Sequence, residues 1–127
     1  MLGIKNKKNK ILLVEDDALL LNLLAKQLKK SGFNVEKVTN GLEVIPMAKS
    51  FRPDLILLDL ILPGLDGFEI LRNLREDNKL SDIPIVVLSN LDKEEDVKST
   101  IALGAREHVV KVGVKLEDII GIVKRNI

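Results

Sequence analysis

Four short apolar runs that each end in a polar residue restrict the fold of this chain more than any other feature. The runs are Ile11–Val14, Leu55–Leu58, Ile85–Leu88 and His108–Val110. Continuous apolar runs such as the first three are typical of parallel strands that are buried on both faces. Because helix-like stretches separate the runs, we expect an α/β domain in which helices cover both faces of a doubly wound parallel sheet.

Strand-like and helix-like segments alternate along the whole chain, and the spacing of apolar residues predicts where each one lies. Three of the runs lie in strands expected at Asp54–Asp59, Ile83–Ser89 and Glu107–Lys111, and one further strand is expected at Phe33–Val38. Helices are expected from Asp17 to about Lys30, over about Gly41–Ser50, after Asp66, and from a cap at Asp92 to about Gly104. The first helix should bury Leu20, Leu23, Leu24 and Leu28, and a last helix Leu116, Ile119, Ile120, Val123 and Ile127. Pro46 predicts that the second helix is short or kinked, because proline lacks a backbone donor.

Length and composition exclude several classes of protein. The 127 residues correspond to one domain, and the absence of Cys excludes disulfides and thiolate metal sites, which suits the cytoplasm. A net charge of +1 argues against strong binding to nucleic acid, and no apolar stretch approaches the roughly 18 residues of a membrane span. Residues 1–9 are basic; we interpret them as a solvated extension of a domain over 10–127, although they could also touch an acidic partner.

Polar residues stand directly after the apolar runs: Glu15 and Asp16 after the first, then Asp59, Ser89 and Lys111. In a parallel sheet they gather at the carboxyl edge, where open α/β sheets bind ligands. The three acids would repel one another unless a cation such as Mg²⁺ joined them. The Asp59 carboxylate could then act as a nucleophile toward phosphorus and form an acyl phosphate.

Each of these residues also has a simpler explanation when it is taken alone. The acids could cap helices or turns, Ser89 could begin a loop, and Lys111 could be solvated. Their joint placement at strand ends is harder to explain in that way. The alternative that remains is a flavodoxin-like scaffold whose site has decayed.

The segments ILLVEDD, LILLDLILPGLDG, IVVLSN and HVVKV resemble the receiver domain of two-component response regulators. The similarity extends from about Lys10 to Ile127, and the Asp59 segment with Pro63-Gly64 and Asp66-Gly67 is its most specific part. The resemblance implies a flavodoxin-like (βα)5 fold with strand order 2-1-3-4-5.

The resemblance also implies a role for each polar residue. Asp59 would be the phosphoacceptor, supplied by a histidine kinase or a histidine phosphotransfer protein. Asp16, Asp59 and the carbonyl of Ile61 would bind Mg²⁺ directly, and Glu15 through water. Ser89 and Lys111 match the switch hydroxyl and the phosphate-pairing lysine, and His108 stands at the switch position of the fifth strand. The face made by the fourth helix, fifth strand and fifth helix would then control a partner.

Four positions depart from the family pattern. Val112 stands where the family usually has proline after the lysine, and we expect the cis peptide bond to be kept there because it aims Lys111. His108 replaces the usual aromatic switch residue, and we interpret it as a half-buried ring that packs like Tyr rather than as a pH-dependent switch. Ile61 and Leu91 are apolar and cannot orient an attacking water, so we expect slow loss of the phosphoryl group.

The sequence therefore indicates a phosphorylation-controlled binding switch and not a turnover enzyme. No helix-turn-helix or catalytic segment follows Ile127, so we expect a single-domain regulator, the alternative being a receiver from a longer chain. It would be a monomer or a phosphorylation-dependent dimer. Two other functions stay open: a degenerate receiver that binds partners without phosphorylation, and a Mg²⁺-dependent phosphohydrolase that uses Asp59.

Overall fold

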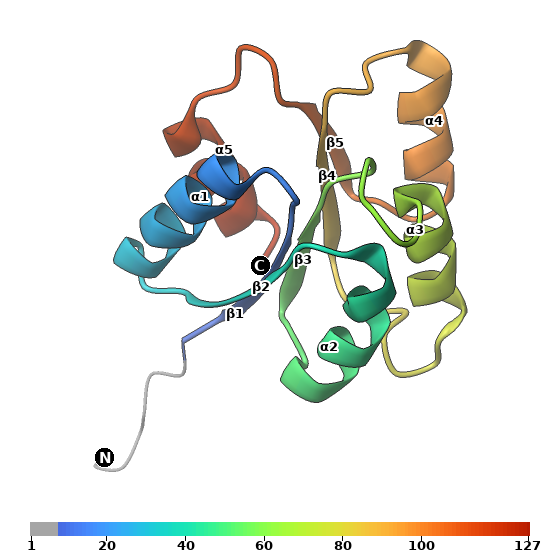
Figure 1. The fold of residues 1–127 in the computed structure, drawn as a ribbon, viewed down its shortest axis with the longest axis horizontal. Helices are drawn as coiled ribbons and strands as arrows, with labels where there is room; N and C mark the ends of the chain where they lie inside the picture. Colours follow the sequence, from blue (N-terminus) through green and yellow to red (C-terminus); the bar gives the residue numbers. More distant parts are fainter. Residues whose placement is uncertain (1–7) are drawn as a thin grey trace.

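The computed structural model describes residues 8–127, so the basic segment expected at 1–9 lies almost entirely outside the described residues (Figure 1). A five-stranded parallel sheet has the order β2-β1-β3-β4-β5, as the family resemblance implied. The strands are β1 (Lys10–Val14), β2 (Asn34–Val38), β3 (Leu55–Leu58), β4 (Ile85–Ser89) and β5 (Glu107–Val110). The helices are α1 (Ala18–Lys30), α2 (Val44–Phe51), α3 (Gly67–Glu76), α4 (Glu94–Ala102) and α5 (Leu116–Arg125), with a 3-10 turn η1 at Gly41–Glu43.

Helices cover both faces of the sheet, with α1 and α5 on one face and α2, α3 and α4 on the other (Figure 1). Successive side chains of a strand point to opposite faces. Ile11 and Leu13 therefore pack in the core beneath α1 and α5, whereas Leu12 and Val14 pack in the core beneath α2 and α3. Because both faces are covered, the central strands are apolar throughout.

Three details of the helices differ from expectation. Leu23 is exposed and Leu21 is buried in its place, because several consecutive leucines in α1 leave the orientation of the helix ambiguous in the sequence. Ile127 lies beyond the end of α5 and is exposed. Asp92 does not cap α4: the N-cap residue is Lys93, and its side chain makes no capping hydrogen bond.

The expectation of a short second helix is confirmed. Pro46 is the third residue of α2, in the first turn, where a helical N–H has no partner within the helix. The chain therefore enters α2 through η1, and the helix extends over only eight residues.

Close backbone packing positions the loop that follows β3. An ideal Cβ atom built on Gly67 would lie 2.3 Å from the Cα atom of Leu60, so a side chain there would force the two segments apart. Asp66 caps α3 by accepting the N–H of Phe68 at 2.7 Å. Helix α3 therefore begins directly against the residue that follows Asp59. None of the helices in residues 8–127 combines the length and the apolarity that crossing a membrane requires.

Candidate functional site

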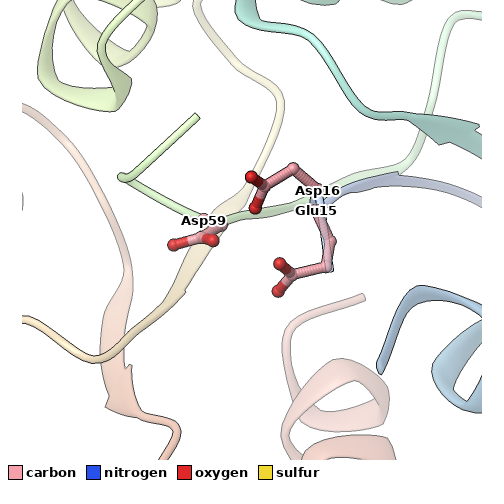
Figure 2. Close-up of side chains that lie close together, drawn as sticks. All are labelled: Glu15, Asp16 and Asp59. Carbon is pink, nitrogen blue, oxygen red and sulfur yellow. The ribbon is translucent and has the colours of Figure 1, made fainter. Parts of the chain in front are cut away.

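Three carboxyl groups meet at the carboxyl edge of the sheet (Figure 2). Glu15 and Asp16 follow β1, and Asp59 follows β3. Each residue contributes one oxygen atom to a cluster in which all three atoms lie within 4.8 Å of one another. Glu15 and Asp59 are buried, whereas Asp16 is exposed. Because Val14 and Leu58 are paired in register, the acids that follow them come to lie side by side.

Lys111 follows β5 and brings its ammonium group to these acids. Its Nζ donates to Asp59 Oδ2 at 2.9 Å and lies 2.6 Å from Glu15 Oε1. Burial alone would lower the pKa of Lys111, but the hydrogen bonds and negative charges of Glu15 and Asp59 outweigh it, and the pKa is raised. The ammonium group is therefore a fixed positive charge at neutral pH.

The Glu15 carboxyl group contacts one ammonium group and one backbone N–H. Its Oε2 accepts the N–H of Asp17 at 3.1 Å. Its Oε1 is buried and lies 2.6 Å from Lys111 Nζ. Burial raises the pKa of Glu15 and the charge of Asp59 adds to this effect, although the Lys111 ammonium group and the Asp17 N–H oppose it.

This set of donors fits a hard divalent cation. Such ions prefer carboxylate, carbonyl and water oxygens, and they relieve repulsion between clustered acids. The buried Glu15 carboxyl group lies beside two further carboxyl groups that could share the same ion. The residues able to hold it are therefore Glu15, Asp16 and Asp59.

The backbone holds the Asp59 side chain in place. Its N–H donates to the carbonyl of Val14 at 3.0 Å, and its Oδ1 accepts the N–H of Ile61 at 3.2 Å. The Ile61 side chain is 58% exposed. Together with Leu91 it lines a cavity of about 270 Å³ next to the loop that carries Asp59. The border of the site on this side is therefore largely apolar.

Ser89, His108 and Thr100 are connected by hydrogen bonds through the loop after β4. The buried Ser89 Oγ accepts the N–H of Leu91 at 3.2 Å. The Leu91 carbonyl lies 2.7 Å from Nε2 of His108 in β5, and Nδ1 of the same ring lies 2.9 Å from the Thr100 hydroxyl in α4. Because a carbonyl oxygen only accepts, Nε2 carries a proton. The half-buried His108 ring therefore packs inward, as expected, and it also bonds at both nitrogens.

Thr100 is the residue of this region that sequence analysis missed. It is the buried residue of α4, and its hydroxyl oxygen also lies 2.9 Å from the Val97 carbonyl oxygen. The signal in the sequence was weak, since α4 has no clear apolar stripe that would identify its inner face. A threonine among charged residues reads as a surface position.

The expected cis peptide bond between Lys111 and Val112 is absent, and that expectation is wrong. No cis peptide bond occurs within residues 8–127. A cis bond without proline is disfavoured by about 2.5–4 kcal/mol. The chain instead turns at Gly113, which has a φ of 83°, and the N–H of Val114 donates to the Lys111 carbonyl at 3.3 Å. Lys111 reaches Asp59 from this trans backbone.

Comparison with known proteins places the chain in a family. Residues 11–124 match the family profile described as the response regulator receiver domain. Protein PilH of Pseudomonas aeruginosa is 34% identical over 102 residues, which cover 80% of this chain and 84% of PilH. The chemotaxis response regulator CheY4 of Vibrio cholerae has a similar structure, with a TM-score of 0.88 at 26% identity, covering 95% of this chain and all of that one.

Other relatives are longer than this chain. The DNA-binding dual master transcriptional regulator RpaA of Synechocystis is 33% identical over 102 residues, but the match covers only 42% of its length. The chain thus spans less than half of that relative. The matched family profile and the similarity to PilH establish that the chain belongs to the response regulator receiver domain family of two-component signalling systems.

Proposed function

We propose that this chain is a phosphorylation-controlled switch in which Asp59 accepts a phosphoryl group from a histidine kinase or a histidine phosphotransfer protein. The observation that carries the proposal is the position of Lys111 Nζ, 2.9 Å from Asp59 Oδ2, beside two further acids at the sheet edge. Phosphoryl transfer requires positioning and charge neutralisation more than acid–base chemistry. A buried carboxylate with an ammonium group and a cation site beside it supplies both.

The transfer step is a displacement at phosphorus. An Asp59 carboxylate oxygen forms the new bond to phosphorus while the bond from phosphorus to the donor's histidine nitrogen breaks, and the electron pair leaves with the imidazole. The product is an acyl phosphate on Asp59. Lys111 remains beside Asp59 and pairs with the phosphoryl oxygens as negative charge moves onto this residue.

Glu15, Asp16, Asp59 and the Ile61 carbonyl are proposed to hold Mg²⁺. The ion would neutralise charge on the phosphoryl oxygens. The raised pKa of Glu15 supports a cation site at this position, because burial and the neighbouring Asp59 disfavour its negative charge when no ion is bound. The exposed Asp16 lies at the solvent side, where an ion would enter.

Ser89 and His108 are proposed to couple phosphorylation to the face made by α4, β5 and α5. The Ser89 hydroxyl is able to donate to a phosphoryl oxygen and would then release the N–H of Leu91. Because the Leu91 carbonyl is bonded to His108, that change would alter the contact between the loop and β5. Phosphorylation would shift the population toward the conformation with the altered face, and a partner would bind that conformation preferentially.

Transfer from a phosphorus–nitrogen bond tests this proposal. The protein is incubated with Mg²⁺ and phosphoramidate, a small donor with the same type of bond as phosphohistidine. We expect one covalent phosphoryl group that hydroxylamine releases, as an acyl phosphate requires, and none in Asp59→Asn. Steady hydrolysis of a phosphomonoester would instead indicate a phosphohydrolase; Ile61, an apolar residue, stands where such an enzyme often has its general acid.

A further inference from the structure

A cavity of about 680 Å³ lies at the amino-terminal edge of the sheet, at the opposite end of the strands from Asp59. It is bounded by the C-terminal end of α2 and the segment that joins α3 to β4, in the lower part of Figure 1. Pro53, Leu80 and Ile83 form the apolar part of its lining. Its volume is within the range of small-molecule sites, roughly 300–1,000 Å³.

The polar part of the lining is mainly cationic. Lys49, Arg52 and Lys79 contribute three positive charges, and Asp77 contributes one negative charge. Asp77 is already engaged, because its Oδ2 lies 3.2 Å from Lys49 Nζ and its Oδ1 accepts the N–H of Lys79 at 2.8 Å. In the described part of the chain, neither Arg52 nor Lys79 forms an ion pair through its side chain. Two positive charges therefore face this cavity without a partner.

The backbone at Arg52 gives an independent reason to examine this residue. Arg52 is the C-cap of α2 and has a φ of 53°, in the left-handed region that favours glycine. It is the one residue other than glycine with positive φ within residues 8–127. This conformation is uncommon for a residue with a side chain, so it is reasonable to ask what the Arg52 side chain contributes.

We propose that this cavity binds a small organic phosphate, with the phosphate held by Arg52 and Lys79 and the remainder packed on Pro53 and Leu80. The planar guanidinium group binds two phosphate oxygens at once, and the lysine adds a point charge. The chain's own N-terminal segment does not complement the cavity, because Lys5, Lys7 and Lys8 make it basic. This site is separate from Asp59, so the proposal stands or fails independently of phosphorylation.

The full chain, labelled with ¹⁵N and kept free of Mg²⁺, is titrated with AMP, adenosine and inorganic phosphate while amide shifts are followed by NMR. We expect AMP to shift amides in 49–54 and 77–83 and to leave those of Asp59 and Lys111 unchanged. Arg52→Gly and Lys79→Gln should each weaken AMP binding about tenfold, which corresponds to 1.4 kcal/mol. Adenosine should bind more weakly than AMP, and salt should weaken AMP binding.

Arg52→Gly keeps the fold, because glycine adopts the left-handed conformation without strain. Lys98→Gln in α4 is the matched control and should leave AMP binding unchanged. The proposal is overturned if AMP shifts no amide around the cavity, or if both cavity variants bind AMP as the parent does. Arg52 would then serve only to complement the negative end of the α2 dipole. Tighter binding of an oligoglutamate peptide than of AMP would also overturn it, in favour of an acidic protein partner.

Discussion

The Nε2 atom of His108 lies 2.7 Å from the carbonyl oxygen of Leu91, so that strand β5 is bonded directly to the loop that follows Ser89. The same ring contacts the Thr100 hydroxyl in α4 through Nδ1 at 2.9 Å. Three elements that are separate in sequence therefore share one side chain. A rearrangement of this loop that moves the Leu91 carbonyl has to break or rebuild the bond to His108.

Replacing His108 should loosen this region without removing the phosphoacceptor. His108→Phe keeps a planar ring but loses both hydrogen bonds, and we expect a loss of stability of about 1 kcal/mol. Amide hydrogen exchange at residues 90–93 and in α4 should become faster, while Asp59 is still phosphorylated. Thr100→Val, which removes only the hydroxyl partner, serves as the matched variant. Unchanged exchange in His108→Phe would show that the hydrogen bonds do not hold the loop.

Neutralising Glu15 should stabilise the protein in the absence of divalent ions. The raised pKa of Glu15 means that its proton is bound more tightly in the folded than in the unfolded state. The Glu15 carboxyl group therefore contributes to stability at a pH below its ordinary pKa of 4.5, and this contribution is lost as the pH rises through the raised pKa of the folded state. At neutral pH the carboxyl group is charged, and its charge opposes folding. Glu15→Gln should therefore raise the free energy of unfolding at pH 7 when no divalent ion is present.

The same Glu15→Gln variant can be tested in the presence of Mg²⁺. The increase in melting temperature on adding Mg²⁺ should be smaller in Glu15→Gln than in the parent, because an oxygen ligand has lost its charge. Asp16→Asn is the control for burial: its exposed carboxyl group should affect Mg²⁺ binding but hardly change stability without the ion. Thermal unfolding followed by circular dichroism suits this chain, which contains neither Trp nor Tyr. Lower stability of Glu15→Gln without Mg²⁺ would contradict the account.

Arg75 should be the most damaging charged residue to remove from the far edge of the sheet. Its guanidinium group donates to the carbonyls of Ser81, Ile83 and Gly104, which lie in two separate loops. Arg75→Met should lower the free energy of unfolding by about 2–3 kcal/mol, because several carbonyls lose a charged donor.

Arg72→Met in the same helix is the matched control for Arg75. Its partner is the exposed Glu69, so the loss should be about 0.5 kcal/mol or less. Urea unfolding of both variants measures the difference. Equal losses in the two variants would show that the carbonyl contacts of Arg75 contribute little.

Much of the fold could be predicted because apolar runs and the polar residues after them are local patterns. The orientation of α1 could not be, since Leu19, Leu20 and Leu21 offer apolar side chains in several directions and only packing selects Leu21. The predicted N-cap of α4 was also wrong, because acidic residues near the start of a helix do not show which residue is the N-cap.

The acidic residues of the site could be predicted because they directly follow the strands. The contacts of His108 could not be predicted in this way. Its partners are a backbone carbonyl, which carries no sequence signature, and Thr100, which lies in a helix of low amphipathicity. The trans bond before Val112 is followed by a turn at Gly113, and the family resemblance had indicated a cis bond instead. Contacts that involve backbone atoms therefore could not be predicted from the sequence.

The apolar border of the site predicts slow loss of the phosphoryl group. Ile61 and Leu91 line a cavity beside the loop that follows β3, and they carry no group that could orient an attacking water. Ile61→Gln should shorten the lifetime of the acyl phosphate about tenfold or more, since an amide can position water. Ile101→Gln, an exposed position in α4, is the control. A parent lifetime of seconds that Ile61→Gln leaves unchanged would reject this explanation.

The measurement that tests the central claim most directly is the intact mass of the protein after incubation with acetyl phosphate. The account predicts that one phosphoryl group is added in the presence of Mg²⁺, that none is added without Mg²⁺, and that none is added to Asp59→Asn. An unchanged mass under all conditions, with histidine kinases also tried as donors, would contradict it and would favour a receiver that binds its partners without phosphorylation.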